Sequence, residues 1–217
     1  MKMVVVASGD LDSRDAAVLD GAGLVIAADG GATALERLGR VPDRLVGDLD
    51  STDPGLVERL AAGGTSIERH PTDKEASDAE LAVLEALEGG DGETVLLGAI
   101  GGERLDHAVA NLLMLADPAL AGRDLRIVHG ATTVRVLRGG ERIVLVGEAG
   151  DLVSLLPVGG DAAGVRTDGL RWALDGERLP MGRSRGLSNE VLDAPASVTL
   201  EAGMLLVVEI ATRGASA

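Results

Sequence analysis

The sequence contains no cysteine, no phenylalanine and no tyrosine, and it has a single tryptophan, Trp172. The lack of cysteine excludes disulfide bonds and thiolate metal sites. Because large aromatic side chains are almost absent, Val, Leu, Ile, Ala and Met must fill the core. Lysine is also rare, since Lys2 and Lys74 are the only two in 217 residues. The rarity of these residue types draws attention to Trp172 and Lys74.

Long hydrophobic runs and positive charge are also scarce. No segment approaches the roughly 20 apolar residues that a membrane helix requires, and the apolar stretch 3–8 is too short for the core of a signal peptide. We therefore expect a cytoplasmic protein. The net charge of −15 argues against a broad nucleic-acid footprint or a membrane-binding surface. A nucleotide substrate would need local positive charge from a metal ion or an arginine.

Short β-branched runs alternate with amphipathic helical runs over residues 1–131. The expected strands are 3–8, 24–29, 44–47, 66–70, 94–100 and 125–129. The expected helices lie near 13–20, 31–38, 54–62, 78–88 and 105–116. This alternation predicts an α/β domain in which helices flank a parallel, Rossmann-like sheet.

The pattern changes over residues 132–217, where short strands are separated by Gly, Asp and Pro. The expected strands are 133–137, 142–146, 152–156, 164–167, 170–174, 196–200 and 205–210. The turn at 138–141 predicts a hairpin between the first two strands. These features predict a smaller all-β domain, a sandwich or a barrel, and the residues from Arg213 onward are expected to form a frayed tail.

Acidic residues follow several of the expected strands in the first domain. They lie in V-G-D-L-D-S at 46–51, T-D-K-E-A-S-D at 72–78, G-G-E-R-L-D-H at 101–107 and D-G-G at 29–31. In a parallel sheet such strand ends gather along one edge, where ligands bind. Carboxylates gathered there repel one another unless a cation joins them, and Mg²⁺ prefers hard oxygen ligands. Glycine turns and helix N-termini beside Mg²⁺ suggest a phosphorylated substrate, most simply a nucleotide.

Asp48 and Asp50 lie two residues apart after a predicted strand. In an extended chain this spacing points both carboxylates to the same side, as a shared metal ion requires. The alternative role is to cap the helix that begins at Pro54, but Asp53 already fits that role. Asp48 and Asp50 are therefore candidate metal ligands and catalytic residues.

Asp78 begins a predicted helix, and Ser77 and Glu80 have the spacing of a capping box. That role leaves Asp73, Lys74 and Asp78 available for function, although a charged surface loop is the simpler interpretation of this segment alone.

The pair Gly101-Gly102 precedes another helix, and glycines there let the backbone approach a phosphate. Arg104 can add a charge-assisted contact. An isolated Gly-Gly is usually only a turn, and His107 alone is more often a structural hydrogen-bonding residue than a catalyst.

Trp172 in the β domain is either core filler, the usual role of a tryptophan, or a flat face on which a cationic or aromatic ligand stacks. Ser188 and Asn189 lie in a polar turn. They can hydrogen-bond a heterocycle or cap that turn.

Taken in order, these segments resemble the thiamine pyrophosphokinase family over nearly the whole chain. The matching segments are A-D-G-G-A at 28–32, P-D-R-L-V-G-D-L-D-S at 42–51, D-K-E-A-S-D at 73–78, G-A-I-G-G-E-R-L-D-H-A-V-A-N at 98–111, G-L-R-W-A-L at 169–174 and G-L-S-N-E at 186–190. The resemblance implies Mg²⁺-dependent transfer of a diphosphate from ATP to thiamine with release of AMP. It also implies a homodimer with thiamine bound near the subunit contact, against the β domains.

The resemblance assigns roles to individual residues. The implied metal ligands are Asp29, Asp48, Asp50 and Asp78, and the last three are also implied as catalytic, together with Asp106. From the glycine turns and charged residues at the strand ends, the predicted nucleotide-binding residues are Asp29, Gly30, Gly31, Lys74, Gly101, Gly102, Arg104 and His107. The implied thiamine-binding residues are Thr167, Trp172, Ser188 and Asn189. Asp78 and Asp106 are the candidates for the general base.

Two departures and three alternatives accompany this interpretation. The family's glycine element usually runs Gly-Gly-Arg-x-Asp-His, whereas Glu103 adds a residue here before Arg104, and the acid loop ends in Ser77-Asp78 where Thr-Asp is more usual. A Mg²⁺-dependent phosphatase is one alternative, although its D-x-D motif would follow the first strand. The others are a non-catalytic thiamine or nucleotide sensor and a pyrophosphokinase for another small alcohol.

Overall fold

The computed structural model describes residues 1–90 and 92–212, so the expected tail from Arg213 lies outside the described residues. The chain divides into two compact units, Met1–Gly130 and Ala131–Ala217. Among the described residues, no helix combines the length and apolar character needed to cross a bilayer.

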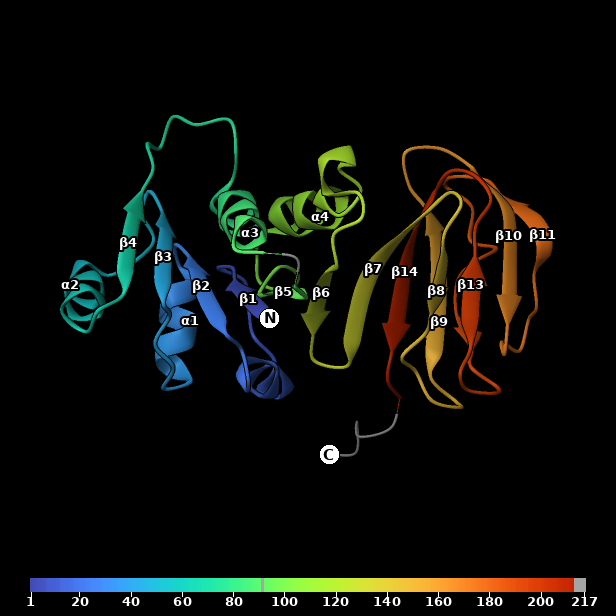
Figure 1. The fold of residues 1–217 in the computed structure, drawn as a ribbon, viewed down its shortest axis with the longest axis horizontal. Coiled ribbons are helices and arrows are strands. Elements are labelled where there is room, and N and C mark those ends of the chain that lie inside the picture. The colour runs from blue at the N-terminus through green and yellow to red at the C-terminus, as the bar shows by residue number, and fades with distance from the viewer. Residues whose placement is uncertain (91, 213–217) are drawn as a thin grey trace. The chain divides into compact units, whose positions relative to one another are not determined.

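The first unit is built on a parallel sheet (Figure 1). Its strands are β1 (Met3–Val6), β2 (Leu24–Ala28), β3 (Arg44–Gly47), β4 (Ser66–Arg69), β5 (Thr94–Leu97) and β6 (Leu125–His129). They are ordered β6-β5-β1-β2-β3-β4, and Met3 of the central strand pairs with Leu24 on one side and Thr94 on the other. The chain builds outward from β1 to β4 and then returns to β5, next to β1. This reversal is a topological switch point, where open α/β sheets bind ligands beyond the strands' carboxyl ends.

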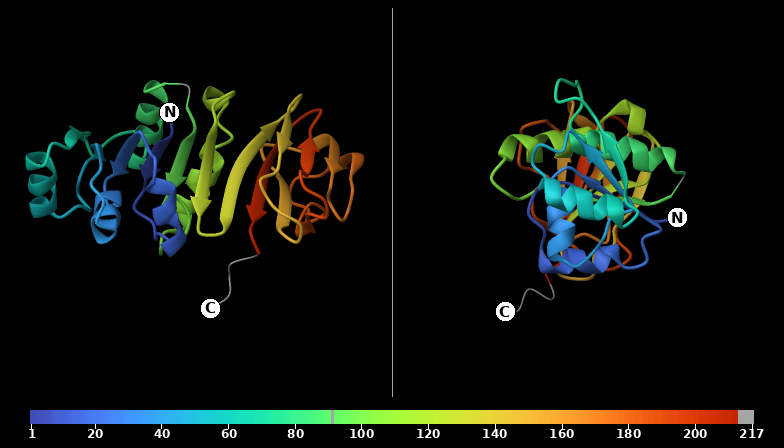
Figure 2. Two further views of the ribbon diagram at one scale, coloured as in Figure 1. Left: turned by 60° about the horizontal axis from the view of Figure 1, so that its bottom comes forward. Right: turned by 90° about the vertical axis from the view of Figure 1, so that its left-hand side faces the viewer.

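Helices cover both faces of this sheet, with α3 and α4 on one face and α1 and η1 on the other (Figure 2). The helical elements are η1 (Ser13–Leu19, a 3₁₀ helix), α1 (Gly31–Arg37), α2 (Pro54–Ala62), α3 (Asp78–Glu88), α4 (Leu105–Met114) and η2 (Pro118–Leu120, a 3₁₀ helix). Local chemistry sets their first residues: Asp53 accepts a hydrogen bond from the Leu56 amide at the start of α2, and Ser77 accepts one from the Glu80 amide at the start of α3.

The second unit is a sandwich of two antiparallel sheets, which confirms the prediction of an all-β domain. One sheet is ordered β12 (Asn189–Glu190), β9 (Leu152–Pro157), β14 (Met204–Ile210), β7 (Thr132–Arg138). The other is ordered β11 (Asp175–Leu179), β10 (Ala162–Asp168), β13 (Ser197–Thr199), β8 (Arg142–Val144). Buried aliphatic side chains from both sheets, such as Leu155 and Val207 from the first and Val165 and Val198 from the second, form one core.

The predicted hairpin at 138–141 is wrong. The turn itself forms, since the Glu141 amide donates to the Arg138 carbonyl, but β7 pairs with β14 while β8 pairs with β13. Gly140 donates to the carbonyl of Leu200, so the turn leads from one sheet into the other. Partners far along the chain decide this path, and a local turn pattern does not contain them.

The predicted strand at 170–174 is also wrong. Leu170 makes only an isolated bridge to Val191, and the next strand, β11, begins at Asp175. Gly169 has φ of +74° and packs closely against the carbonyl of Asp193, so the chain leaves the strand direction there. The segment 169–174 is instead a loop between β10 and β11, and hydrogen bonds between Thr167 and Leu174 close its base.

Candidate active site

A cleft of about 810 Å³ lies in the first unit, beyond the carboxyl ends of β1, β2, β3 and β5. It contains most of the residues predicted to bind metal, nucleotide or phosphate. These are Asp29, Asp48, Asp50, Lys74, Asp78, Gly101, Gly102, Arg104, Asp106 and His107. The strand-end acids, which are far apart in the sequence, therefore lie around one cavity at the switch point of the sheet.

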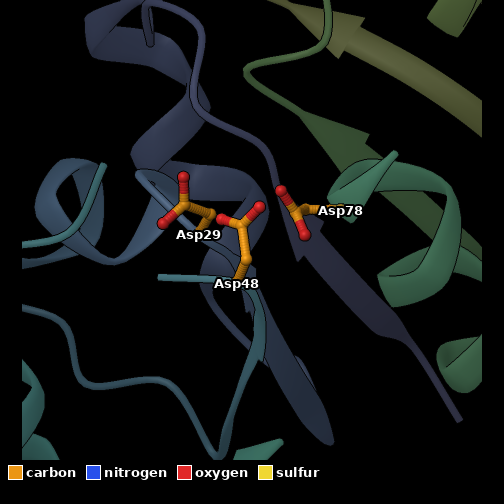
Figure 3. A group of neighbouring side chains, drawn as sticks. All are labelled: Asp29, Asp48 and Asp78. Atoms are coloured by element: carbon orange, nitrogen blue, oxygen red, sulfur yellow. The ribbon is translucent and has the colours of Figure 1, made fainter. Parts of the chain in front are cut away.

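Three carboxylates form a compact cluster in this cleft. Asp29 follows β2, Asp48 follows β3, and Asp78 is the first residue of α3, and one oxygen of each lies within 4.8 Å of the others. Figure 3 shows the three side chains next to one another. A single cation placed among these oxygens would contact all three residues.

Lys74 provides the positive charge nearest to this cluster. Its Nζ lies 3.0 Å from Oδ1 of Asp78 and 3.3 Å from Oδ2 of Asp48. Burial by itself would lower the pKa of Lys74, but the contacts with Asp78 and Asp48 outweigh this effect and raise the pKa. The pKa of Asp48 is lowered, mainly by the hydrogen bond that it accepts from the Asp50 amide. Lys74 and Asp48 therefore both stay charged at neutral pH.

Asp29 differs from its neighbours because it is almost completely buried. Burial raises its pKa, and the negative charges of Asp78 and Asp50 add to this, while a hydrogen bond from Thr52 Oγ1 at 3.0 Å acts in the opposite direction. An ionised carboxylate at this position is costly in the absence of a cation. Asp29 thus gains the most from a metal ion in the cluster.

Gly47, the last residue of β3, leaves the space that the cluster occupies. A Cβ at this position would lie 2.8 Å from Oδ1 of Asp78 and 3.2 Å from the Cβ of Asp29. Its φ of +144° is also unfavourable for other residues. Gly47 was not among the predicted site residues, although its position directly before the D-x-D motif was a signal.

The backbone between Asp48 and Asp50 is not extended, so the geometry assumed for this motif is wrong. The buried Leu49 has φ of +64°, an uncommon conformation for a branched residue, and Asp50 is exposed at the cleft wall. Asp29 also has a positive φ, +42°. Backbone strain of this kind, typically 1–3 kcal/mol for each residue, concentrates at functional sites. The turn at Leu49 brings Asp48, but not Asp50, into the three-carboxylate cluster.

Gly30 and Gly31, both predicted to bind nucleotide, do not line the cleft. A Cβ on Gly31 would overlap the carbonyl oxygen of Val6, and one on Gly30 would press on the Ser8 side chain at 3.0 Å. Close packing of α1 against β1 therefore explains glycine at both positions.

The Gly101-Gly102 element lines the cleft in a conformation that suits glycine, with φ of +95° and +77°. Arg104 directly precedes α4 and forms two hydrogen bonds with the Asp106 carboxylate, at 3.0 and 2.7 Å. The side-chain hydrogen bond from Arg104 lowers the pKa of Asp106 well below its usual range. Both side chains are exposed and turned to solvent, as is suitable for groups that exchange partners when an anion arrives.

Sequence reasoning missed the residues that support this element. The Gly9 amide after β1 donates to the Gly98 carbonyl after β5, and a Cβ on either glycine would overlap backbone atoms of the opposite segment. The buried Asn111 donates from Nδ2 to the carbonyl of Ala99 at 2.9 Å and so links α4 to the loop after β5. The S-G-D sequence at 8–10, directly after the first strand, was an available signal for this corner.

A second cavity, of about 220 Å³, lies in the second unit. It is lined by Leu155, Trp172, Leu174, Arg185, Gly186, Leu187, Ser188 and Asn189. Three of the four residues predicted to bind thiamine therefore lie around one pocket. Thr167 does not line it, because its hydroxyl accepts a hydrogen bond from the Leu174 amide and closes the adjacent loop.

Trp172 is not core filler, since 52% of the residue is exposed. Ser188, beside it in the pocket, has φ of +56°, so each of the three non-glycine residues with positive φ within 1–90 and 92–212 lies in a candidate site or, for Leu49, between two residues that line one. The pocket thus combines an accessible indole, aliphatic walls and a strained polar turn, which suits a flat heterocyclic ligand.

The carboxylate cluster of the first unit fits a hard divalent cation. All of its donors are oxygens, as Mg²⁺ prefers. Oδ1 of Asp78 is buried and receives no hydrogen bond with good geometry, although the Lys74 ammonium lies beside it. The charge of three carboxylates also exceeds what one lysine neutralises. The arrangement can therefore hold a metal ion and, with the glycine element opposite, the phosphates of a bound anion.

Comparison with known proteins matches the two units of the chain to two different family models. A family model described as the thiamin pyrophosphokinase catalytic domain matches residues 15–128, and a model described as the vitamin B1 binding domain of thiamin pyrophosphokinase matches residues 142–205. The thiamine pyrophosphokinase of Bacillus subtilis is 23% identical over 185 residues, which span 85% of this chain and 86% of that protein. Thiamine pyrophosphokinase 1 of Oryza sativa is 25% identical over 217 residues, spanning 88% and 80% of the two chains.

Solved structures show the same fold. The crystal structure of the Bacillus subtilis thiamine pyrophosphokinase has a TM-score of 0.85 at 22% identity and covers 97% of this chain and 99% of its own. The thiamin pyrophosphokinase of Candida albicans has a TM-score of 0.80 at 16% identity, with 96% and 90% covered. Because the catalytic-domain model alone matches more than half of the sequence, this chain belongs to the thiamin pyrophosphokinase family.

Proposed function

We propose that this protein transfers the terminal diphosphate of ATP to the hydroxyethyl group of thiamine, producing thiamine diphosphate and AMP with Mg²⁺ as cofactor. The three-carboxylate cluster at the switch point of the sheet is the observation that carries the proposal. It supplies a site for Mg²⁺-bound phosphates in the unit that matches the family's catalytic domain. The family membership supplies the expected acceptor.

The proposal assigns ATP and Mg²⁺ to the first unit, at residues 1–131. Asp29, Asp48 and Asp78 would hold the metal ion, with Asp50 at the wall of the same cleft. The ion would neutralise charge that develops on the phosphate oxygens. Because the protein is strongly acidic overall, local positive charge at this cleft is needed to bind a nucleotide at all.

Residues around the metal site would position the phosphates of ATP and stabilise their negative charge. The backbone of Gly101 and Gly102 lets phosphate approach closely, and Arg104 and Lys74 supply charge to the phosphates. The thiamine hydroxyl oxygen attacks the β-phosphorus, the bond from that phosphorus to the oxygen bridging it to the α-phosphorus breaks, and AMP leaves. Positioning and electrostatic stabilisation account for most of the catalysis of such transfers.

The proton of the thiamine hydroxyl must move to a base. Asp106 is suited to this role only when its ion pair with Arg104 is broken. While the pair is intact, the pKa of Asp106 is held low, so the carboxylate is a weak base. The phosphates of ATP would compete for the Arg104 guanidinium. Transfer of Arg104 from Asp106 to a phosphate would return the pKa of Asp106 toward its usual range and couple nucleotide binding to proton removal. Asp78 remains the second candidate for the base.

The proposal assigns thiamine to the second unit, at residues 132–217. The exposed indole face of Trp172 attracts the positively charged thiazolium ring or stacks on the pyrimidine ring. Ser188 lies in the same pocket and can hydrogen-bond the heterocycle. The match of this unit to the family's vitamin B1 binding domain supports the assignment.

We also propose that the protein is a homodimer. The helix α4 supports this, because Asn111 is its only buried residue while Leu105, Val109 and Leu113 lie on one exposed side. An exposed apolar stripe of this kind is a common feature of surfaces that associate. Sedimentation equilibrium tests the proposal: a mass twice that of the chain supports it, and a monomer at micromolar concentration contradicts it.

Product analysis tests the activity. Purified protein is incubated with Mg²⁺, ATP and thiamine, and nucleotides and thiamine esters are separated by chromatography. We expect AMP and thiamine diphosphate in equal amounts. The appearance of ADP and thiamine monophosphate would show attack at the γ-phosphorus, and inorganic phosphate without a thiamine ester would indicate a phosphatase. ATP and thiamine binding without any product would identify a sensor.

A further inference from the structure

The side chain of Asn189 is fully engaged with the backbone around Trp172. Its Oδ1 accepts hydrogen bonds from the amides of Trp172 at 3.0 Å and Glu190 at 2.9 Å, and its Nδ2 donates to the carbonyl of Trp172 at 2.8 Å. The residue is also buried. The Asn189 side chain therefore holds both the amide and the carbonyl of Trp172. Its own best donor and acceptor positions are occupied and are not available to a ligand.

The indole of Trp172 is held as well. The guanidinium of Arg171 lies over the ring, with Cζ 5.8 Å from the ring centroid, which is within the range of a cation–π contact. The guanidinium is itself anchored by an ion pair between Nη2 and Oε1 of Glu190, at 2.8 Å. The backbone amide of Arg171 donates to the carbonyl of Glu190 at 2.8 Å, so the two segments are paired through backbone and side chains.

We infer that Asn189, Arg171 and Glu190 are positioning residues that hold Trp172 as a one-sided binding platform. An indole has two faces, and the guanidinium covers one of them. A flat ligand is therefore left with the opposite face, held at a fixed orientation. This inference rests on the proposed function for the identity of the ligand, thiamine, but not for the arrangement of the platform.

Asn189 therefore has a different role from the one that the sequence predicts. Sequence reasoning placed it among the groups that contact thiamine, whereas the hydrogen bonds make it a residue that acts through Trp172. A direct ligand and a positioning residue have different signatures. Substitution of a residue that only contacts thiamine leaves Trp172 unchanged in the free protein. Loss of a positioning residue changes the motion and accessibility of Trp172 before any ligand is added.

The single tryptophan makes this difference measurable, because all indole emission comes from Trp172. We would compare the fluorescence anisotropy and acrylamide quenching of wild type, Asn189→Ala and Arg171→Met without ligand. Arg171→Met removes both the cation–π contact and the ion pair with Glu190 that hold the side chain over the ring, so the quenching constant should rise about twofold. Asn189→Ala should lower the anisotropy. Arg171→Lys, which keeps the cation but not the planar fork, should recover part of the effect.

The matched control is Arg178→Met, which removes another exposed, ion-paired arginine of the same unit outside the Trp172 pocket. It should leave anisotropy, quenching and thiamine binding unchanged. Asn189→Asp provides a second variant in case Asn189→Ala does not fold. It keeps the acceptor oxygens for the Trp172 and Glu190 amides, but it replaces the Nδ2 donor with a charged oxygen that the Trp172 carbonyl repels, so the anisotropy should again be lower than in wild type.

Thiamine titration then links the platform to binding. We expect Kd for thiamine to rise about tenfold in Asn189→Ala, the change that one or two hydrogen bonds correspond to. The rise in Arg171→Met should be smaller, and Glu190→Gln should add little to it because both act on the same contact. Kd for Mg-ATP should not change in any of these variants.

Unchanged anisotropy and quenching in both Asn189→Ala and Arg171→Met would overturn the inference, whether or not thiamine binds. Weaker thiamine binding by Asn189→Ala with unchanged free-protein fluorescence would also overturn it, because Asn189 would then be a direct ligand. If wild type failed to bind thiamine while the variants still altered Trp172, the proposed acceptor would be wrong and the positioning role would be supported.

Discussion

The two candidate sites satisfy their polar groups in opposite ways. In the cleft of the first unit, Asp29, Asp48 and Asp78 are brought together with one lysine between two of them, and a buried oxygen of Asp78 lacks a well-aligned hydrogen-bond donor. In the pocket of the second unit, the polar atoms of Asn189 are already bonded to the surrounding backbone. The first site keeps charge in excess, whereas in the second the Asn189 amide is satisfied and the indole of Trp172 presents a flat face.

This difference indicates what each site can recognise. Under the proposed function, the excess negative charge at the strand edge is balanced by a cation, and the cation in turn would bind anionic phosphates. A satisfied pocket contributes shape, stacking and orientation instead of charge. The two sites should therefore respond differently to mutation, with large effects on turnover in the first and moderate effects on acceptor affinity in the second.

The largest effect is expected from Asp48→Asn. The substitution removes one of the three carboxylates without changing side-chain size, so kcat should fall about 10³-fold while the circular dichroism spectrum stays that of the wild type. Asp20→Asn, at an exposed surface carboxylate outside the cleft, is the control and should retain full activity. AMP formation under saturating Mg-ATP measures the effect, and turnover within tenfold of the wild type would contradict the metal-site assignment.

Gly47→Ala should have the next largest effect. The new Cβ would push on Asp78 and Asp29 and displace the cluster by a fraction of an ångström, and we expect kcat/KM to fall about 10²-fold with weaker Mg²⁺ binding. Gly90→Ala is the control that separates steric contact with the cluster from the backbone strain of alanine at a positive φ. Gly90 has a similar φ, +138°, and nothing within 4 Å of the added Cβ. Equal losses in both variants would show that strain alone is responsible.

Trp172→Ala should affect the second site alone. Loss of the indole face should raise the thiamine KM about tenfold, since stacking on an aromatic side chain is worth about 1–3 kcal/mol by alanine substitution. The KM for ATP should stay constant. An unchanged thiamine KM would show that Trp172 does not contact the acceptor.

The smallest effect concerns stability at the first site. Burial raises the pKa of Asp29 above the ordinary value of 3.8, so its ionised form destabilises the folded protein. This cost is absent below the ordinary pKa and grows as pH rises through the raised pKa. Without Mg²⁺ at pH 7, Asp29→Asn should therefore have a higher Tm than the wild type.

Thermal unfolding across pH checks this prediction. The difference between Asp29→Asn and wild type should shrink as pH falls toward 4. Added Mg²⁺ should stabilise the wild type more than the variant. A lower Tm for Asp29→Asn at pH 7 would contradict the assigned cost of burying this carboxylate.

Sequence reasoning predicted the parallel sheet and the acidic edge because both depend on local patterns. Strand and helix periodicities repeat along the first unit, and residues that follow parallel strands must meet at one edge. Asp29 and Asp48, which are 19 residues apart, could therefore be placed together from the sequence alone.

The features that sequence reasoning missed depend on partners distant in the chain. The path after Arg138 is decided by hydrogen bonds to Leu200 and Gly203, and the need for glycine at position 47 arises from Asp78. The role of Asn189 likewise depends on Trp172, 17 residues away. None of these contacts has a local signature, since a polar residue in a turn looks the same whether it contacts a ligand or its own backbone.

The assignment of different roles to the two sites is tested most directly by measuring thiamine binding to Asp48→Asn. The fluorescence of Trp172 can be titrated with thiamine in the variant and in wild type, and AMP formation can be assayed on the same samples. We predict that the variant forms no measurable AMP but binds thiamine with the wild-type Kd. Loss of thiamine binding together with turnover, or retention of both, would contradict the assignment of phosphate transfer to the acidic cleft and acceptor binding to the Trp172 pocket.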